Sequence, residues 1–197
     1  STTGTVNFTP TDDSVYEGNE TAIIAISSVS GADASESGSQ SVTITITENE
    51  SAPTITLARS AASIDENSAS TVTLTATISG VTDSAVTVAL STSGTATEGT
   101  DYGTISDITI SAGATTGTAT LDPTDDNIYE DDETATIDIS SVSGKSGVTE
   151  NGTQQVSVTI AENESAPTVT LATSATSIAE NAGTSLTLTA TLSVATT

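Results

Sequence analysis

Strict alternation of apolar and hydroxyl-bearing residues constrains the fold of this chain more than any other feature. It runs through STVTLTATIS (70–79), QSVTITITE (40–48), QQVSVTIAE (154–162) and TSLTLTATLS (184–193). Because successive side chains of a strand point to opposite faces of a sheet, the pattern predicts half-buried β-strands. The chain has one Phe, three Tyr and no Trp, so the predicted core must consist of Val, Ile, Leu and Ala.

Charge and residue types exclude several functions. The formal net charge is −24, and Arg59 and Lys145 are the only cationic side chains. Nucleic acids and anionic membranes bind clustered Lys and Arg, so we expect neither as a partner. No apolar run is long enough to insert this segment into a bilayer. The absence of Cys and His removes disulfides, thiolate and imidazole metal ligands and the commonest general base. We therefore expect no enzymatic activity.

Internal repetition predicts the domain organisation. DDSVYEGNE (12–20) recurs as DDNIYEDDE (125–133), and ENESAPTITLA from Glu48 recurs as ENESAPTVTLA from Glu162. Both ends of the chain lack the counterpart of about 84–113, which predicts a window from a longer array. The predicted units are the C-terminal part of one repeat over 1–52, a complete repeat over 53–164 and the N-terminal part of a further repeat over 165–197.

Seven short strands are expected in the complete repeat, separated by turns rich in Gly, Ser, Thr and Asp. They cover roughly 54–58, 70–79, 86–91, 105–110, 117–122, 133–142 and 153–161. Strands of this length and spacing are typical of an antiparallel sandwich of immunoglobulin-like architecture. The predicted fold class is therefore all-β, with tandem antiparallel β-sandwiches, one complete and two partial.

The acidic residues of the complete repeat are concentrated in four phrases, SIDEN, TEGTDYG, DPTDDNIYEDDE and AENE. The strand order places the second, third and fourth at one pole, and Glu66 of the first reaches this pole if the opening strand breaks after Ala58. Crowded carboxylates raise one another's pKa values, and a hard divalent cation relieves this. Calcium accepts six to eight oxygen ligands in flexible geometry, so it is the predicted ion. A solvated acidic loop and a halophilic surface stay open as alternatives.

Three motifs occur together in this chain: DDxxYExxE, a glycine-flanked DY and an opening Glu-Asn. In this combination the chain resembles the Calx-β domain, a sandwich repeat found in sodium–calcium exchangers and bacterial surface proteins. The resemblance covers the complete repeat and both partial ones. It implies that calcium (Ca2+) is held in the complete repeat by Glu66, Asp101, Asp125, Asp126, Glu130, Glu162 and Glu164. The matching residues of the partial repeats are Asp12, Asp13, Glu17, Glu48, Glu50 and Glu180. Glu98, Asp131 and Asp132 are expected to be solvated, and Tyr102 and Tyr129 to pack under the loops.

These expectations combine into a structural function. Short ENESAPT linkers and calcium at the poles between repeats would stiffen the chain, as expected of a stalk, adhesin shaft or extracellular fibre. The predicted partners are neighbouring repeats of the same chain, with lateral or head-to-tail self-association. The predicted location is secreted or cell surface, in a bacterium. Two alternatives stay open, a calcium-sensing regulatory domain and a subunit of a self-assembling filament.

Overall fold

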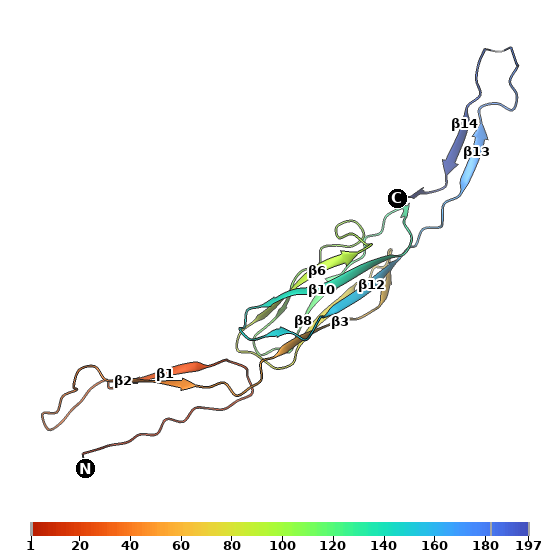
Figure 1. The fold of residues 1–197 in the computed structure, drawn as a ribbon. Helices are drawn as coiled ribbons and strands as arrows, with labels where there is room; N and C mark the ends of the chain where they lie inside the picture. Colours follow the sequence, from red (N-terminus) through yellow and green to blue (C-terminus); the bar gives the residue numbers. More distant parts are fainter. Residues whose placement is uncertain (1, 182, 197) are drawn as a thin grey trace.

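The chain is all-β and elongated. A computed structural model describes residues 2–181 and 183–196, and within these ranges every regular element is a strand. The N-terminal segment (1–52), the central segment (53–164) and the C-terminal segment (165–197) follow one another along one direction (Figure 1). None of the described residues forms a helix that could span a bilayer.

Two sheets form the central segment, which confirms the predicted sandwich. The first contains, in spatial order, β4 (Ser63–Asp65), β12 (Gln155–Ala161), β10 (Glu133–Ser143), β6 (Val86–Gly94) and β7 (Ile108–Ile110). The second contains β11 (Thr149–Glu150), β3 (Thr54–Arg59), β5 (Val72–Ile78) and β8 (Thr116–Leu121). Pairing is antiparallel except for β4 with β12 and β11 with β3.

All seven predicted strands are present, with two notable differences at their ends. The strand expected over 86–91 continues to Gly94. The strand expected over 105–110 covers only Ile108–Ile110, so Asp107 lies outside it. The Asp107 carboxylate accepts a hydrogen bond from Leu90 N (3.1 Å), which ties the residue before β7 to β6.

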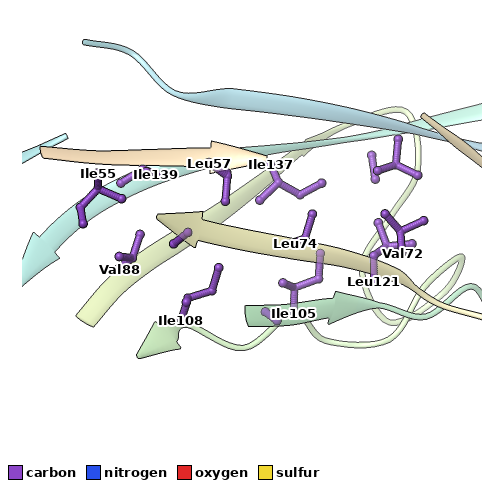
Figure 2. Close-up of a cluster of buried hydrophobic side chains, with 14 of the residues drawn as sticks. Ile55, Leu57, Val72, Leu74, Val88, Ile105, Ile108, Leu121, Ile137 and Ile139 are labelled. Carbon is purple, nitrogen blue, oxygen red and sulfur yellow. The ribbon is translucent and has the colours of Figure 1, made fainter. Parts of the chain in front are cut away.

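The core lies between the two sheets, as the alternating pattern predicts. In β5, Val72, Leu74, Ala76 and Ile78 are all buried, whereas the threonines between them are half-buried or exposed. Side chains from both sheets meet in this layer (Figure 2). Each fully buried Val, Leu or Ile contributes about 1.5–3 kcal/mol relative to an exposed side chain, so many small aliphatic residues can replace the missing aromatics.

The opening strand crosses from one sheet to the other. β3 ends at Arg59, one residue after the predicted break, and β4 begins at Ser63 on the edge of the opposite sheet. Ser60 fixes the crossing, because its N–H donates to Thr73 O (2.9 Å) and its hydroxyl accepts from Thr73 N (2.9 Å). Glu66 N then donates to Ala161 O (3.0 Å), so the chain arrives beside the end of β12.

Each terminal segment contains one antiparallel hairpin. β1 (Glu20–Ala25) pairs with β2 (Ser41–Ile46), and β13 (Val169–Thr173) pairs with β14 (Leu188–Leu192). By sequence these hairpins correspond to β10/β12 and β3/β5, so each has only one of the two layers of a sandwich. Large apolar side chains on them, such as Ile23 and Leu171, are therefore exposed. A last short strand, β15 (Ala195–Thr196), pairs in parallel with β9 (Ile128–Tyr129) of the central segment.

Candidate metal centre

Four connections bring acidic residues to the end of the central segment that faces the C-terminal segment. Glu66 follows β4, Asp101 lies between β6 and β7, the 122–132 loop joins β8 to β10, and Glu162 follows β12. These are the four phrases in which the sequence concentrates its acids. Two groups of three carboxylates form there, and we call them the Glu66 cluster and the Asp101 cluster.

The Glu66 cluster consists of Glu66, Glu162 and Glu164, each offering one carboxylate oxygen within 4.8 Å of the others. Glu66 is only 7% exposed. Glu164 Oε2 is buried and has no hydrogen-bond partner among the described residues. A buried carboxylate oxygen without a donor is costly, so this oxygen is a ready ligand for a cation.

The Asp101 cluster consists of Asp101, Glu130 and Glu133, with the same 4.8 Å limit between one oxygen of each. Asp101 is buried, and its Oδ2 accepts a hydrogen bond from Thr97 N (2.6 Å). Asp101 O accepts from Thr124 N (3.0 Å), which fixes the 95–103 loop to the 122–132 loop. Glu133 was not among the predicted ligands.

Glu162 connects the two clusters. Its Oε2 accepts a hydrogen bond from Glu130 N (2.6 Å), and its Oε1 accepts one from Glu164 N (2.6 Å). Asp126 N donates to Glu66 Oε1 (3.2 Å), and Asp126 Oδ1 in turn accepts from Ile128 N (2.6 Å). Backbone N–H groups thus hold the carboxylates in place from three connections, and the clusters share one hydrogen-bonded frame.

Proton affinity is high at several of these carboxyl groups. Burial, followed by the hydrogen bond and charge of Asp101, raises the pKa of Glu133 to about 7. The hydrogen bond from Glu164 to Glu162 raises the pKa of Glu164 to about 6. Burial is also the main cause of the raised pKa values of Glu66 and Glu130. Burial opposes ionisation of Glu162 as well, but backbone N–H donors of Glu130 and Glu164 lower its pKa overall.

Asp125 and Asp126 belong to neither cluster. Asp125 is exposed and Asp126 is half-buried, and the charges of both add to the raised pKa of Glu66. Two neighbours expected to be solvated, Asp131 and Asp132, are exposed, and each also accepts a hydrogen bond. Asp131 accepts a hydrogen bond from Tyr129 OH (2.7 Å), and Asp132 accepts one from Glu162 N (3.1 Å). Tyr102 is 1% exposed, so it packs in the core as expected.

The acidic loop of the N-terminal segment has the same internal contacts. Glu48 Oε2 accepts from Glu17 N (2.5 Å) and Glu48 Oε1 from Glu50 N (3.0 Å), as Glu162 does from Glu130 and Glu164. Val15 N donates to Asp13 Oδ1 (2.8 Å), the counterpart of the Ile128–Asp126 bond. Asn49 Nδ2 donates to Asp12 Oδ1 (2.9 Å). The repeated phrase therefore specifies a repeated local structure.

The remaining predicted ligand, Glu180, is not brought to these acids. It is exposed in the connection between β13 and β14 and is part of neither cluster. The acidic loop that would complete a site around it has no counterpart in the C-terminal segment. Similarly, the N-terminal segment has no counterpart of Glu66 or Asp101.

Sequence reasoning missed Glu133 although a signal for it was present. Glu133 is the last residue of DDxxYExxE and recurs as Glu20. It is also the first residue of β10, so its side chain was assigned to the strand rather than to the pole. Because the strand begins at the pole, a residue can belong to both.

The donor set fits a hard divalent cation. Both clusters offer only carboxylate oxygens, which suit Ca²⁺ or Mg²⁺, and calcium accepts the irregular geometry more readily. Neither cation of the protein neutralises them, because Arg59 donates to Ala62 O and Lys145 pairs with Asp83 at the other end of the central segment. An external cation is the remaining source of positive charge.

Comparisons with known proteins identify one matching family model and similar solved structures. The family model of the Calx-beta domain matches residues 1–50 and 48–164. The apo form of the Calx CBD1 domain is a similar solved structure, with 21% identity and a TM-score of 0.45, covering 56% of this chain and 98% of that chain. CBD12 from CALX1.2 is similar at 20% identity and a TM-score of 0.44, covering 53% of this chain and 44% of that chain. No curated protein matches the chain.

Proposed function

Because this chain belongs to the Calx-beta domain family, we propose that it is a calcium-stabilised structural segment of a secreted or cell-surface stalk, adhesin shaft or fibre. One observation carries the proposal. Six carboxylates, two of them on buried residues, converge in two clusters at the end of the central segment. Among the described residues, Lys145 pairs with Asp83 and Arg59 donates to Ala62 O, so neither cationic side chain is paired with these clusters. The protein requires an external cation to hold this arrangement in its ionised form.

The two clusters define two ion positions. One ion takes oxygens from Glu66, Glu162 and Glu164. Asp125 and Asp126 add negative charge near Glu66. The second takes oxygens from Asp101, Glu130 and Glu133. Backbone carbonyls and water complete the six to eight ligands that calcium accepts. Binding energy for an ion held only by the folded chain stabilises that fold by mass action.

The position of the clusters links calcium to the stiffness of the chain. Glu162 and Glu164 belong to the ENESAPT linker that leads directly from β12 to the C-terminal segment. An ion bound by both glutamates attaches the linker to the pole through Glu66 of the opening strand. Without the ion, hydrogen bonds such as that from Glu164 N to Glu162 Oε1 restrain these residues. Calcium therefore restricts the bending of one repeat against the next.

Calcium supply favours an extracellular location. Extracellular modules of modest affinity bind calcium at about 10⁻⁴–10⁻³ M, which the surroundings of a cell supply and the cytoplasm does not. The neighbouring repeats of the same chain are the proposed partners. The chain offers no nucleophile–base pair that uses His or Cys, which supports a non-enzymatic role.

Thermal unfolding in calcium tests the proposal. Millimolar calcium should raise the unfolding temperature of the chain markedly, whereas sodium chloride of equal ionic strength should raise it little. Differential scanning calorimetry with and without chelator gives the comparison. If both melting curves coincide, the structural role of calcium is wrong and a generally acidic surface explains the composition.

A further inference from the structure

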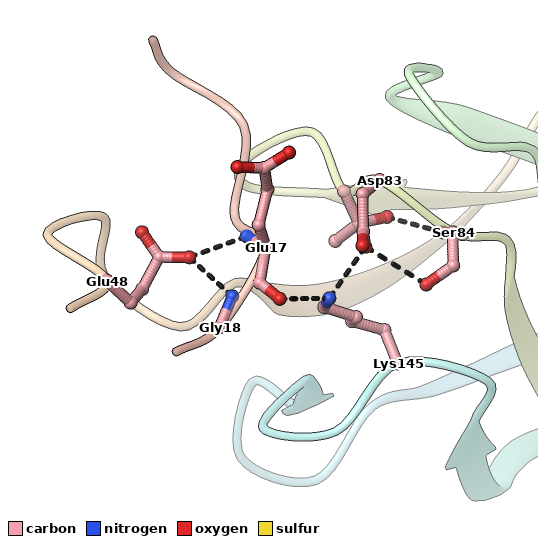
Figure 3. A network of polar contacts seen from close by, with 7 residues as sticks. Glu17, Gly18, Glu48, Asp83, Ser84 and Lys145 are labelled. Atoms are coloured by element: carbon pink, nitrogen blue, oxygen red, sulfur yellow. Dashed lines mark hydrogen bonds and ion pairs between the residues drawn. The ribbon is translucent and has the colours of Figure 1, made fainter. Parts of the chain in front are cut away.

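The N-terminal segment contacts the central segment at the end opposite to the Glu66 and Asp101 clusters. Tyr16 N donates to Val81 O (2.9 Å), and Tyr16 forms a parallel β-bridge with Thr82. Lys145 Nζ donates to Glu17 O (2.5 Å) and pairs with Asp83 Oδ1 (2.6 Å) (Figure 3). A loop of one repeat is thus bonded to two loops of the next.

Gly147 leaves the space that the Tyr16 side chain occupies. Its φ is +91°, and a β-carbon built on it would lie 2.3 Å from the Tyr16 hydroxyl oxygen and 3.2 Å from ring atom Cζ. The first separation is too short for an additional carbon, so the hydroxyl would have to move, and the second is a tight contact. Lys145 Nζ lies 5.8 Å from the centre of the same ring, on the scale of a cation–π contact. We call Thr82, Lys145 and Gly147 the tyrosine seat.

The same backbone contact occurs a second time in the chain. Tyr129 corresponds to Tyr16 by sequence, and Thr196 corresponds to Thr82. Tyr129 and Thr196 are paired in parallel within β9 and β15, as Tyr16 and Thr82 are. The bridge is therefore a property of the junction between consecutive segments rather than an accident of one pair of loops.

The loop that carries Tyr16 is also hydrogen-bonded to an acidic residue of its own repeat. Glu48 Oε2 accepts hydrogen bonds from Glu17 N and from Gly18 N (2.6 Å), while Glu17 O faces Lys145 (Figure 3). The peptide groups after Tyr16 are therefore held on one side by a proposed calcium ligand and on the other side by the next repeat. The tyrosine seat of the central segment therefore lies next to the acidic residues of the N-terminal segment.

The seat distinguishes one repeat from another. Where the central segment has Gly144-Lys145-Ser146-Gly147, the N-terminal segment has Gly31 followed by Ala32-Asp33-Ala34, without the lysine and without the second glycine. The N-terminal segment therefore lacks the residues that receive a tyrosine in this manner. Docking on the seat is specific to repeats that carry the Lys-Ser-Gly sequence.

We propose that Tyr16 is the specificity-determining residue of the junction, and that the tyrosine seat binds the tyrosine-bearing acidic loop of the preceding Calx-beta repeat. The inference rests on the proposed function only in treating the segments as consecutive repeats, because none of the seat contacts requires calcium. Lys145 adds charge selectivity, since a single cation placed against an acidic loop favours that loop over a neutral one. Gly147 adds shape selectivity, because a β-carbon at this position would occupy the space of the Tyr16 hydroxyl group.

Acetylation of Lys145 measures how often the junction opens. Lys145 is the only lysine of the chain, and its side chain is 12% exposed when the loop is docked. The full chain is treated with an acetylating reagent in excess calcium, and mass spectrometry follows the peptide that contains Lys145. Gly147→Ala is compared with Gly152→Ala, because Gly152 also has positive φ (+66°) but has no atom within 4 Å of an added β-carbon.

We expect Gly147→Ala to accelerate acetylation at least about fivefold over Gly152→Ala, because overpacking a tight contact shifts a local opening equilibrium by this factor or more. Tyr16→Ala should accelerate it similarly, although the substitution lies in the other segment. Tyr16→Phe, combined with Gly147→Ala, should return the rate toward that of the parent chain by removing the closest atom.

Equal acetylation rates for Gly147→Ala and Gly152→Ala would overturn the proposed seat, and so would a parental rate for Tyr16→Ala. The result is separable from the test of the proposed function. A chelator that leaves the melting curve of the parent chain unchanged contradicts structural calcium, whereas the acetylation series, performed at one calcium concentration, addresses only the docking of the tyrosine.

Discussion

Glu66→Gln should change the stability of the central segment in opposite directions with and without calcium. Glu66 is 7% exposed and contributes one oxygen to the Glu66 cluster. Its Oε1 accepts a hydrogen bond from Asp126 N (3.2 Å). Gln retains a carbonyl oxygen for this hydrogen bond but loses the charge. The substitution therefore separates the electrostatic role of the carboxylate from its role in fixing the loop.

The expected magnitudes follow from the two states. In chelator, the variant no longer buries a charge and loses repulsion from Glu162, Asp126 and Asp125, so its stability should rise by at least about 1 kcal/mol, the interaction of two unit charges about 4 Å apart in water. In calcium, losing one charged ligand should weaken binding about 10- to 100-fold, which removes about 1.4–2.7 kcal/mol of calcium-dependent stability.

Chemical denaturation in calcium and in chelator measures both values. Asp107→Asn is the matched control, because it removes an exposed acid outside the clusters while keeping an acceptor for Leu90 N. The control should change stability by less than about 0.5 kcal/mol in either buffer. The reasoning is refuted if Glu66→Gln lowers stability equally in both buffers, since Glu66 would then act only through its hydrogen bond.

Three further predictions concern the ligands, pH and shape. Asp125→Ala with Asp126→Ala should weaken calcium binding in titration calorimetry through the loss of two charges near Glu66, and Glu133→Gln should weaken it more than Asp107→Asn does. The folded state raises the pKa of Glu133 from its ordinary 4.5 to about 7, so the ion-free chain should lose stability as pH rises from 5 to 8. Calcium binding near pH 6.5 should release protons, which calorimetry in buffers of different ionisation enthalpy measures. Small-angle scattering should report a more flexible chain after chelation; identical profiles would contradict the stiffening.

The sequence was sufficient to predict the sandwich because its signal is local. Alternation in 70–79 reappears as buried Val72, Leu74, Ala76 and Ile78, and the end of each run lies where Gly, Ser or Asp interrupts it. The gathering of acids followed from strand order, since residues at the same end of alternate strands must meet. The sequence analysis required a break after Ala58 for Glu66 to reach the pole, and the strand ends at Arg59; that the chain also changes sheet before Ser63 was not predicted.

Side-chain roles inside the pole were harder to predict. Asp132 is exposed as expected, but the hydrogen bond that it accepts from Glu162 N depends on the path of two loops, which sequence spacing does not fix. Asp131 has φ +72° and accepts Tyr129 OH, a local conformation that the sequence does not reveal for a residue other than Gly. Asp107 seemed to belong to a strand, but the strand begins at Ile108 and the side chain bonds to β6 instead.

Contacts between segments were beyond sequence reasoning altogether. Nothing in the sequence around Gly147 indicates that this glycine contacts Tyr16, which lies 131 residues earlier in the chain. The contact depends on the relative placement of two repeats, and only the three-dimensional structure supplies it. The recurrence of the bridge at Tyr129 and Thr196 became interpretable once the first junction was known.

The central claim is that calcium occupies the Glu66 and Asp101 clusters, and locating the ions by anomalous X-ray scattering tests it most directly. Crystals of the chain grown in millimolar calcium should show one anomalous peak among Glu66, Glu162 and Glu164 and a second among Asp101, Glu130 and Glu133. Peaks elsewhere on the acidic surface, or no peak at either cluster in well-diffracting crystals, would contradict the account.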